Sequence, residues 1–517
     1  MEVVLGTARL TASKAGAVAL GLAEGERPTR GPAAELDRRS RGAVSELLKS
    51  RDFAGRVSEI AVLYPRGLGA RRVILVGLGP RAGIDEQRLR LAAAQAARRA
   101  RELGARTLTI ALPETDGRAD PARRARHARA CAEGAVLGHY RHTAYRSEPG
   151  PPPLRKIEIA AEGEHGVAAR RELKAAVARG ARWAEATCLA RDLASTPGQD
   201  LTPEVLARRA REIARDTGAK CRVLGVPELE RLGMGALLAV GRGSVHPPRF
   251  IVLERSPRAA HGAAARAGTV VVIGKGVTFD TGGISLKPAQ DMAKMKYDMA
   301  GAAAVLGMFS ALSEAGAGRG LPLRVVGLIP TAENMPGGAA LKPGDVVRAL
   351  DGTTIEVTNT DAEGRLILAD ALGYAARFKP DAVVDLATLT GAISVALGHL
   401  AAGLFTDDDG LADELLAASA ASGERLWRMP LWDDYAVGLR SDTADLANSG
   451  GREGGAILGA MFLKRFARGL RWAHLDIAST AWTPVERPHE PRGPTGFGVR
   501  LLLEWLSRRA SAVRRAT

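Results

Sequence analysis

Three charged side chains stand at alternate positions of one short segment, and their types are suited to chemistry. The segment runs Asn359-Thr-Asp-Ala-Glu-Gly-Arg-Leu366 and carries Asp361, Glu363 and Arg365. Because side chains two residues apart share a face of an extended chain, the spacing predicts all three charges on one side. Two neighbouring carboxylates need a cation, and the arginine is free to bind an anion. In isolation, a solvated turn explains the segment equally well.

A second segment brings further acids and two lysines. An apolar strand at 270–273 precedes a glycine-rich loop that carries Lys275, Asp280 and Lys287, and Asp298 stands just before a helix of small residues. Asp280, Asp298, Asp361 and Glu363 would repel one another if they converged without cations. A two-metal site, which is common in hydrolases, removes that repulsion. Oxygen ligands alone suit magnesium or manganese, and carboxylates also bind zinc.

The elements around these residues predict an α/β protein. The β-branched segment 354–358 precedes the first motif and an apolar helical segment follows it, so the motif is expected in a strand-to-helix turn, where α/β sheets bind ligands. Beyond residue 205, alternation of strands and helices predicts a larger catalytic domain with a mixed, mostly parallel sheet flanked by helices. The expected strands are 221–224, 250–253, 269–273, 324–329, 354–358 and 382–386.

The first part of the chain predicts a smaller α/β domain. Its expected strands are 3–5, 59–63, 72–76, 107–112 and 156–160, with helices near 41–50, 86–103 and 121–138. We therefore expect an N-terminal α/β domain over 1–165, a linker helix over 166–192 and the catalytic domain over 193–517. Segments 258–266 and 315–320 are expected to be surface loops, and 507–515 a frayed basic tail.

Two glycine-rich segments invite a nucleotide-binding interpretation, which we disfavour in both cases. Gly77-Leu-Gly79 follows a strand, but Pro80 removes an amide from any phosphate cradle, and no acid ends a second strand about 20 residues later. Lys275 is not a P-loop lysine, because Gly276 stands where that motif has serine or threonine.

Both charged segments resemble the leucyl aminopeptidase family, the cytosolic two-zinc aminopeptidases. The resemblance covers about residues 185–505, with weaker motifs in the N-terminal part. Besides the two segments it includes Glu333-Asn-Met-Pro, Lys342-Pro-Gly-Asp-Val-Val, Ala387-Thr-Leu-Thr-Gly-Ala and Trp472-Ala-His-Leu-Asp-Ile-Ala. It implies a metal-dependent aminopeptidase that releases N-terminal residues, preferably leucine-like, from peptides with a free N-terminus by attack of a metal-bridging water.

The resemblance also implies a role for each charged residue. The metal ligands would be Lys275, Asp280, Asp298, Asp361 and Glu363, holding two Zn²⁺ or Mn²⁺ ions per subunit, with Asp280 and Glu363 shared between the ions. Lys275 would ligate through its neutral amine, which requires a strongly lowered pKa. Lys287 would polarise the scissile carbonyl. Arg365 would hold a bicarbonate that acts as general base.

Five further residues match family positions that line the substrate pocket: Met295, Thr388, Leu389, Gly391 and Ala478. They are mostly small or apolar, so leucine-like side chains should fit. Ser479 stands where the family pattern has glycine, which leaves the exact side-chain preference open.

Composition limits the alternatives. The chain has 517 residues with 46% hydrophobic content, and it lacks an apolar run of about 18 residues, so no membrane span is expected. Three scattered cysteines and no signal-like start favour the cytoplasm. The net charge of +16 leaves DNA binding open as a second, regulatory or architectural function. The resemblance implies a homohexamer, and because every metal position is filled, an inactive relative is disfavoured.

Overall fold

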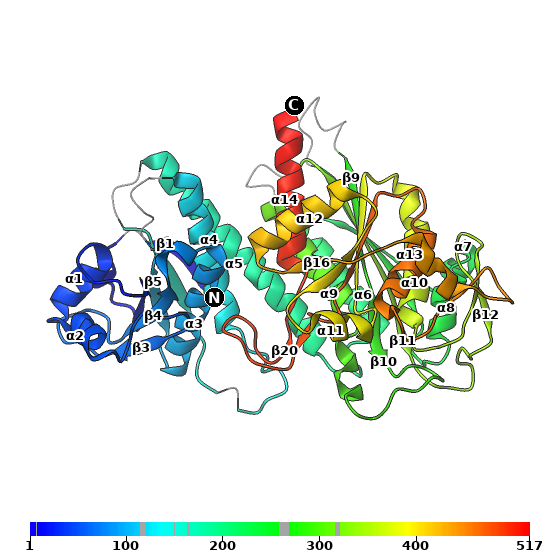
Figure 1. Cartoon of the computed structure of the whole chain (residues 1–517), viewed down its shortest axis with the longest axis horizontal. Helices are drawn as coiled ribbons and strands as arrows, with labels where there is room; N and C mark the ends of the chain where they lie inside the picture. The colour runs from blue at the N-terminus through cyan, green and yellow to red at the C-terminus, as the bar shows by residue number, and fades with distance from the viewer. Residues whose placement is uncertain are drawn as a thin grey trace. The chain divides into compact units, whose positions relative to one another are not determined.

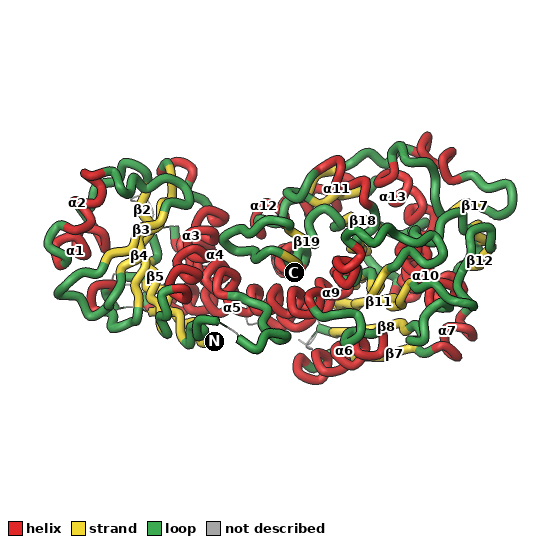
Figure 2. Tube along the Cα trace, turned by 90° about the horizontal axis from the view of Figure 1, so that it is seen from below, coloured by secondary structure: helices red, strands yellow, loops and turns green. Residues whose placement is uncertain are grey.

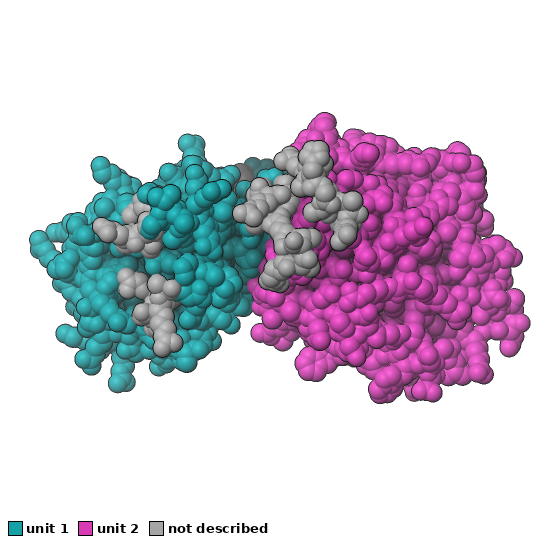
Figure 3. Space-filling model, turned by 90° about the horizontal axis from the view of Figure 1, so that it is seen from above, with its two compact units in different colours: residues 1–185, 485–492 teal, residues 186–484, 493–517 magenta. Residues whose placement is uncertain are grey.

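The computed structural model describes residues 1–6, 8–113, 120–148, 150–162, 166–257, 268–315 and 321–516. The chain forms two compact units (Figure 3). The first comprises Met1–Glu185 and Val485–Arg492, and the second comprises Ala186–Pro484 and Gly493–Thr517. Helix α5 (Val167–Ser195) contains the change from one unit to the other. The expected loop at 258–266 lies outside the described residues, as does 316–320 of the expected insertion.

The first unit is built on a six-stranded sheet in the order β1-β6-β5-β2-β4-β3, parallel except for β3. Helices α3 and α4 pack on one face, and α1 contacts β2 from the other. The bounds are β1 Glu2–Gly6, β2 Ala17–Ala23, α1 Gly31–Arg39, α2 Ala43–Ser50, β3 Ile60–Leu63, β4 Val73–Gly79, α3 Glu86–Glu102, β5 Thr107–Ala111, α4 Pro121–His139 and β6 Lys156–Ala160.

The five strands expected in this unit are present, but the residue pattern did not predict β2. Its residues, Ala-Val-Ala-Leu-Gly-Leu-Ala, are mostly small and have weak strand propensity. Nearly all are buried, because β2 lies inside the sheet between β5 and β4. Gly77 and Gly79 lie within β4, where a Cβ at Gly77 would meet the carbonyl oxygen of Arg56 at 1.8 Å. Close backbone packing therefore accounts for Gly77.

The second unit contains a nine-stranded mixed sheet, mostly parallel, in the order β16-β15-β18-β14-β9-β11-β8-β7 with β10 beside β11. Antiparallel pairs join β15 to β18, β11 to β8 and β8 to β7. The strand bounds are β7 Lys220–Leu224, β8 Arg249–Arg255, β9 Thr269–Gly274, β10 Gly276–Asp280, β11 Arg324–Asn334, β14 Ala382–Ala387, β15 Ala402–Phe405, β16 Leu426–Arg428 and β18 Trp472–Asp476.

Helices cover both faces of this sheet (Figures 1 and 2). One layer contains α6 and α9, with α14 against α9 and α12 against α14, and the other contains α8, α10 and α13. The bounds are α6 Pro203–Thr217, α7 Val226–Leu232, α8 Gly235–Gly241, α9 Ala300–Ala315, α10 Glu363–Ala375, α11 Gly391–Leu397, α12 Asp409–Ser422, α13 Gly455–Phe466 and α14 Val499–Ala516. Because α14 continues to Ala516, the expected frayed tail is wrong: those residues are helical.

Three local expectations about the charged segments are also wrong. Residues 276–280 form strand β10 rather than a loop, because they pair in parallel with the extended end of β11. Strand β13 (Thr354–Glu356) belongs to a separate three-stranded sheet with β12 (Val346–Arg348) and β17 (Leu446–Ala447). Glu363 and Arg365 lie in the first turn of α10, so the three charges do not alternate along an extended chain.

Candidate metal centre

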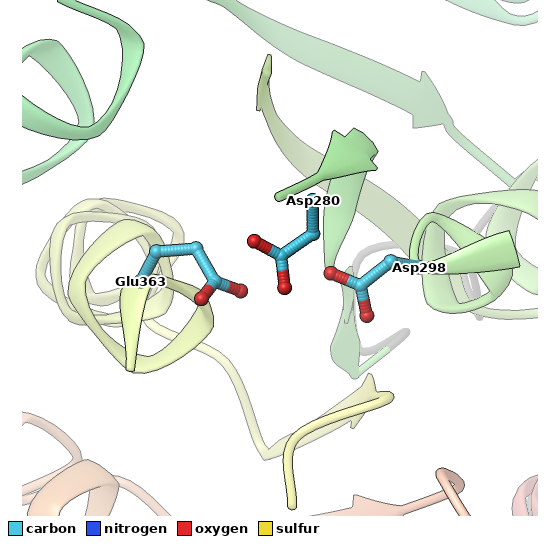
Figure 4. A group of neighbouring side chains, drawn as sticks. All are labelled: Asp280, Asp298 and Glu363. Atoms are coloured by element: carbon cyan, nitrogen blue, oxygen red, sulfur yellow. The ribbon is translucent and has the colours of Figure 1, made fainter. Parts of the chain in front are cut away.

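Three buried carboxylates from separate elements converge in the second unit (Figure 4). Asp280 ends β10, Asp298 lies just before α9, and Glu363 begins α10. Each offers an oxygen, and these atoms all lie within 4.8 Å of one another. The carboxyl groups point toward a common space. Three acids so close and so deeply buried are costly unless cations pair with them.

Lys275 supplies one buried cation. Its Nζ lies 2.9 Å from Oδ2 of Asp298 and 2.9 Å from Oε1 of Glu363, and it donates to the carbonyl oxygen of Thr388 at 2.8 Å. Burial lowers the pKa of Lys275, but the charges of Asp298, Glu363 and Asp280 outweigh burial and raise it overall. The lowered pKa that a neutral amine ligand needs would thus require additional positive charge at the site.

Lys287 supplies a second cation at the more open side of the site. Its Nζ lies 2.9 Å from Oδ2 of Asp280 and also contacts Oδ1 of Asp361. The side chains of Lys287 and Asp361 are 22% and 32% exposed, whereas that of Asp280 is 3% exposed. Asp361 and Lys287 therefore form the rim, where a substrate can reach them.

The donor set fits divalent metal ions. Four carboxylates face two ammonium groups, so the cluster retains excess negative charge. Burial raises the pKa of Asp298 to about 8, and burial and Asp280 also raise the pKa of Glu363. Oε2 of Glu363 is buried without a hydrogen-bond donor among the described residues. Carboxylate oxygens with one lysine nitrogen suit zinc, manganese or magnesium.

Arg365, two residues after Glu363 in the first turn of α10, is buried without an ion-pair partner in the described parts of the chain. Its Nη1 donates to the carbonyl oxygen of Asn448 at 2.7 Å, and Nε has no partner there. Burial lowers the pKa of Arg365 to about 10, against the opposing charges of Glu363 and Asp476. A charged guanidinium with an unused buried donor is suited to a small anion.

Hydrogen bonds join the two acid-bearing segments to each other. Nδ2 of Asn334 donates to Oδ1 of Asp280 at 2.8 Å and to the carbonyl oxygen of Thr360 at 3.0 Å. Oγ1 of Thr360 donates to the carbonyl oxygen of Gly282 at 2.6 Å and accepts from the amide of Ser285 at 2.8 Å. The spacing of Asp280 and Asp361 is therefore fixed by the protein itself.

Of the residues expected to line the substrate pocket, Thr388 contacts the acid cluster directly. Oγ1 of Thr388 donates to Oδ1 of Asp298 at 2.6 Å. Oδ1 of Asp476 accepts from the amides of Leu389 and Ala478, each at 3.2 Å, which joins two pocket segments. Met295 is half-buried in the 3-10 helix Met292–Tyr297, and Gly391 is exposed at the start of α11.

Sequence reasoning missed several residues that hold the site together. Asn334 and Asp476 lie inside segments that carried the family resemblance, and Thr360 lies inside the first charged segment. The sequence signal for these residues is the type of their side chains. Amides, hydroxyls and carboxylates close to metal ligands often orient those ligands by hydrogen bonds. Asn448 carried no such signal, because it lies more than 80 residues from the segment that it contacts.

Comparisons with known proteins support the interpretation of this site as a metal centre. The cytosol aminopeptidase family, catalytic domain, matches residues 188–503, and the N-terminal domain of that family matches residues 19–149. A probable cytosol aminopeptidase of Roseiflexus castenholzii is 48% identical over 469 residues, covering 90% of this chain and 92% of that protein. One of Geobacter sp. (strain M21) is 46% identical over 480 residues, covering 92% and 94%.

Solved structures agree as well. The bottromycin maturation enzyme BotP in complex with Mn is 43% identical, with a TM-score of 0.83, covering 96% of this chain and 100% of that one. A mutant tomato leucine aminopeptidase is 35% identical, with a TM-score of 0.87, covering 98% and 96%. With its buried acidic cluster, the chain is a metal-dependent aminopeptidase hydrolase. It belongs to the cytosol aminopeptidase family.

Proposed function

We propose that this aminopeptidase holds two divalent ions and removes leucine-like residues from peptides with a free N-terminus. The observation that carries the proposal is the convergence of four acids on two lysines. Asp280, Asp298 and Glu363 with Lys275 would hold one ion, and Asp280, Asp361 and Glu363 the other. Manganese is supported by the related enzyme BotP, whose structure is a complex with Mn, and zinc by the leucyl aminopeptidase resemblance.

The chain's own residues supply positioning and charge. When bound, the ions would activate a water molecule and polarise the scissile carbonyl. Lys287 lies at the rim with its ammonium held by Asp280 and Asp361. From there it would donate to the oxygen on which negative charge develops, and such donors stabilise the transition state more than the ground state.

Arg365 would hold a bicarbonate that takes the proton from the attacking water. The guanidinium keeps one buried donor, Nε, unused by the described residues, and parallel hydrogen bonds from a guanidinium fix the orientation of a planar anion. If so, turnover should fall in carbonate-free buffer and recover when bicarbonate is added. The variant R365Q should show no such response.

Thr388, Leu389, Gly391, Ala478 and Met295 would form the pocket for the first side chain. The pocket would therefore favour leucine-like residues over charged ones, because a buried charge without a partner is costly. The solved relatives include both a maturation enzyme and a leucine aminopeptidase, so a panel of amino-acid amides is the appropriate assay.

Metal removal tests the proposal directly. The purified chain would be treated with a chelator, dialysed, and assayed on leucine, methionine, alanine and glutamate amides with zinc, manganese or magnesium added. We expect activity to vanish on chelation, return with manganese or zinc, and be greatest for leucine or methionine. Activity that survives complete metal removal would contradict the proposal.

Assembly, location and DNA binding are separate predictions. No helix in the described parts of the chain is long and apolar enough to cross a membrane. We propose a homohexamer in the cytoplasm, which light scattering after size exclusion and fractionation of cells would test. DNA binding rests only on the net charge of +16; a salt titration with duplex DNA tests it, because counterion release gives a steep salt slope.

A further inference from the structure

Asn448 is a fully buried amide whose side chain makes five hydrogen bonds to the segment that precedes α10. Its Oδ1 accepts from the amide of Thr358 at 2.9 Å, from the hydroxyl of Thr358 at 3.3 Å and from the amide of Asn359 at 3.3 Å. Its Nδ2 donates to the carbonyl oxygens of Asn359 at 2.7 Å and Ala362 at 3.4 Å. One side chain thus contacts both ends of the turn formed by residues 358–362.

The main chain of Asn448 adds two further links. Its amide donates to the carbonyl oxygen of Glu356 at 2.8 Å and continues the parallel pairing of β17 with β13. Its carbonyl oxygen accepts from Nη1 of Arg365 at 2.7 Å. Asn448 therefore connects the end of β13, the turn that carries Asp361, and the guanidinium of Arg365.

The turn needs such a partner because its backbone belongs to neither neighbouring element. Strand β13 ends at Glu356 and helix α10 begins at Glu363. Ala362 at the start of α10 offers no side chain that could cap the helix. Buried backbone groups without partners cost free energy. An asparagine side chain has the acceptor and the donors that the amide and carbonyl groups of such a turn require.

We propose that Asn448 is a positioning residue for the metal centre. It fixes the path of residues 358–362 and thereby the directions in which Asp361 and Glu363 project, while its carbonyl oxygen orients Arg365. The inference rests on the proposed metal binding by Asp361 and Glu363. The hydrogen bonds of the Asn448 side chain all go to the turn, so it acts through the segment that it holds.

The same turn, residues 358–362, is also held by residues other than Asn448. Thr360 bonds to Gly282 and Ser285, and Asn334 bonds to Thr360. Those contacts join the turn to the segment after β10 and to the end of β11, and none of them involves Asn448. We therefore expect removal of the Asn448 side chain to loosen the ligands without separating the two segments. Mutation of a residue that orients metal ligands typically lowers the metal affinity by roughly 10–100-fold.

Asp445 provides a matched control on the same pair of strands. Its Oδ2 accepts from the amide and the hydroxyl of Thr354, both at 2.8 Å. This is the same kind of link that Asn448 makes to Thr358, but it lies at the exposed, far end of β13. The variant D445A removes a comparable cross-link without touching the turn that bears the acids.

The experiment measures Mn²⁺ binding by titration calorimetry to metal-free wild type, N448A, N448D and D445A. We expect N448A to bind at least one Mn²⁺ about 10–100-fold more weakly, and D445A to bind within about twofold of wild type. Circular dichroism and urea unfolding report whether each variant is folded. If N448A does not fold, N448D carries the comparison, because it preserves the volume and one accepting oxygen.

N448D also separates positioning from simple stability. Its carboxyl can donate to the carbonyl oxygen of Asn359 only when protonated, so Mn²⁺ affinity should fall with rising pH relative to wild type. If folded N448A and N448D bind Mn²⁺ like wild type at every pH, the positioning role of Asn448 is overturned, while the proposed metal centre stands. Failure of the wild-type chain to bind Mn²⁺ would overturn the proposed metal centre, and this inference with it.

Discussion

Nζ of Lys275 lies 2.9 Å from Oε1 of Glu363, and the close approach depends on the glycine that follows Glu363. A Cβ placed on Gly364 would lie 2.6 Å from Cε and 2.8 Å from Nζ of Lys275. The lysine therefore reaches the acids by passing directly over the first turn of α10, where only a glycine leaves room.

Gly364→Ala should displace Lys275 and lower aminopeptidase turnover and Mn²⁺ affinity strongly, because the added methyl group occupies the path of the lysine. Gly373→Ala in the same helix is the control. Its Cβ would meet Cδ2 of Leu350 at 3.1 Å, and that flexible side chain can move. Turnover and calorimetric binding are the measurements. Equal activity of the two variants would show that the lysine is not needed in its present place.

Lys287→Ala should reduce turnover by about 10²–10³-fold, the usual effect of removing a group that stabilises a developing oxyanion. The fold should persist because Lys287 is partly exposed, at 22% for the side chain. Lys294→Ala is the control, because Lys294 also forms an ion pair but with an exposed acid, Asp291, that is not part of the metal centre. Steady-state kinetics with a leucine amide would measure the effect of each variant on kcat and KM. A change in KM with unaltered kcat would assign Lys287 to substrate binding instead.

Ser479→Gly should leave the order of substrate preference unchanged. Ser479 is fully buried, and its hydroxyl is already engaged as a donor to the carbonyl oxygen of Ala401 at 2.7 Å. Loss of that bond should lower the free energy of unfolding by about 0.5–1.5 kcal/mol. A panel of amino-acid amides and a urea titration test both statements. A shift of preference toward larger residues would show that the hydroxyl narrows the pocket.

Asp370 should make the stability of the second unit depend on pH. Burial raises its pKa to about 7, although its oxygens accept from the amides of Leu237 and Leu350, each at 2.8 Å. Between its unfolded pKa of about 4 and its folded pKa of about 7, the folded state holds a proton that the unfolded state has released. Stability is therefore lost as pH rises through this range, by at most about 1.4 kcal/mol per pH unit.

Asp370→Asn removes this titration and one of the two acceptors. The variant should be less stable than wild type at pH 5 by about 1–3 kcal/mol, the cost of an unsatisfied buried group. The difference should shrink toward pH 8. Urea unfolding of metal-free protein at pH 5, 6, 7 and 8 measures it. A pH-independent difference between wild type and variant would contradict the raised pKa.

Local residue patterns were sufficient to predict the kinds of groups in the centre and much of the framework. Short apolar runs located β9, the first half of β11 and β14, and the charged segments pointed to Lys275 and the acids as members of one site. These signals can be recognised within a few residues, because hydrophobic periodicity and side-chain chemistry are properties of short segments.

How the segments are held together depends instead on contacts between distant parts of the chain. Strand β10 forms because β11 extends beside it, β13 joins a separate sheet, and β2 is a strand despite its weak propensity because neighbours flank it on both sides. Asn448 meets its turn through strand pairing across about 90 residues of chain. The physical reason is that hydrogen-bond partners distant in sequence are selected by packing and strand order, which local residue patterns do not encode.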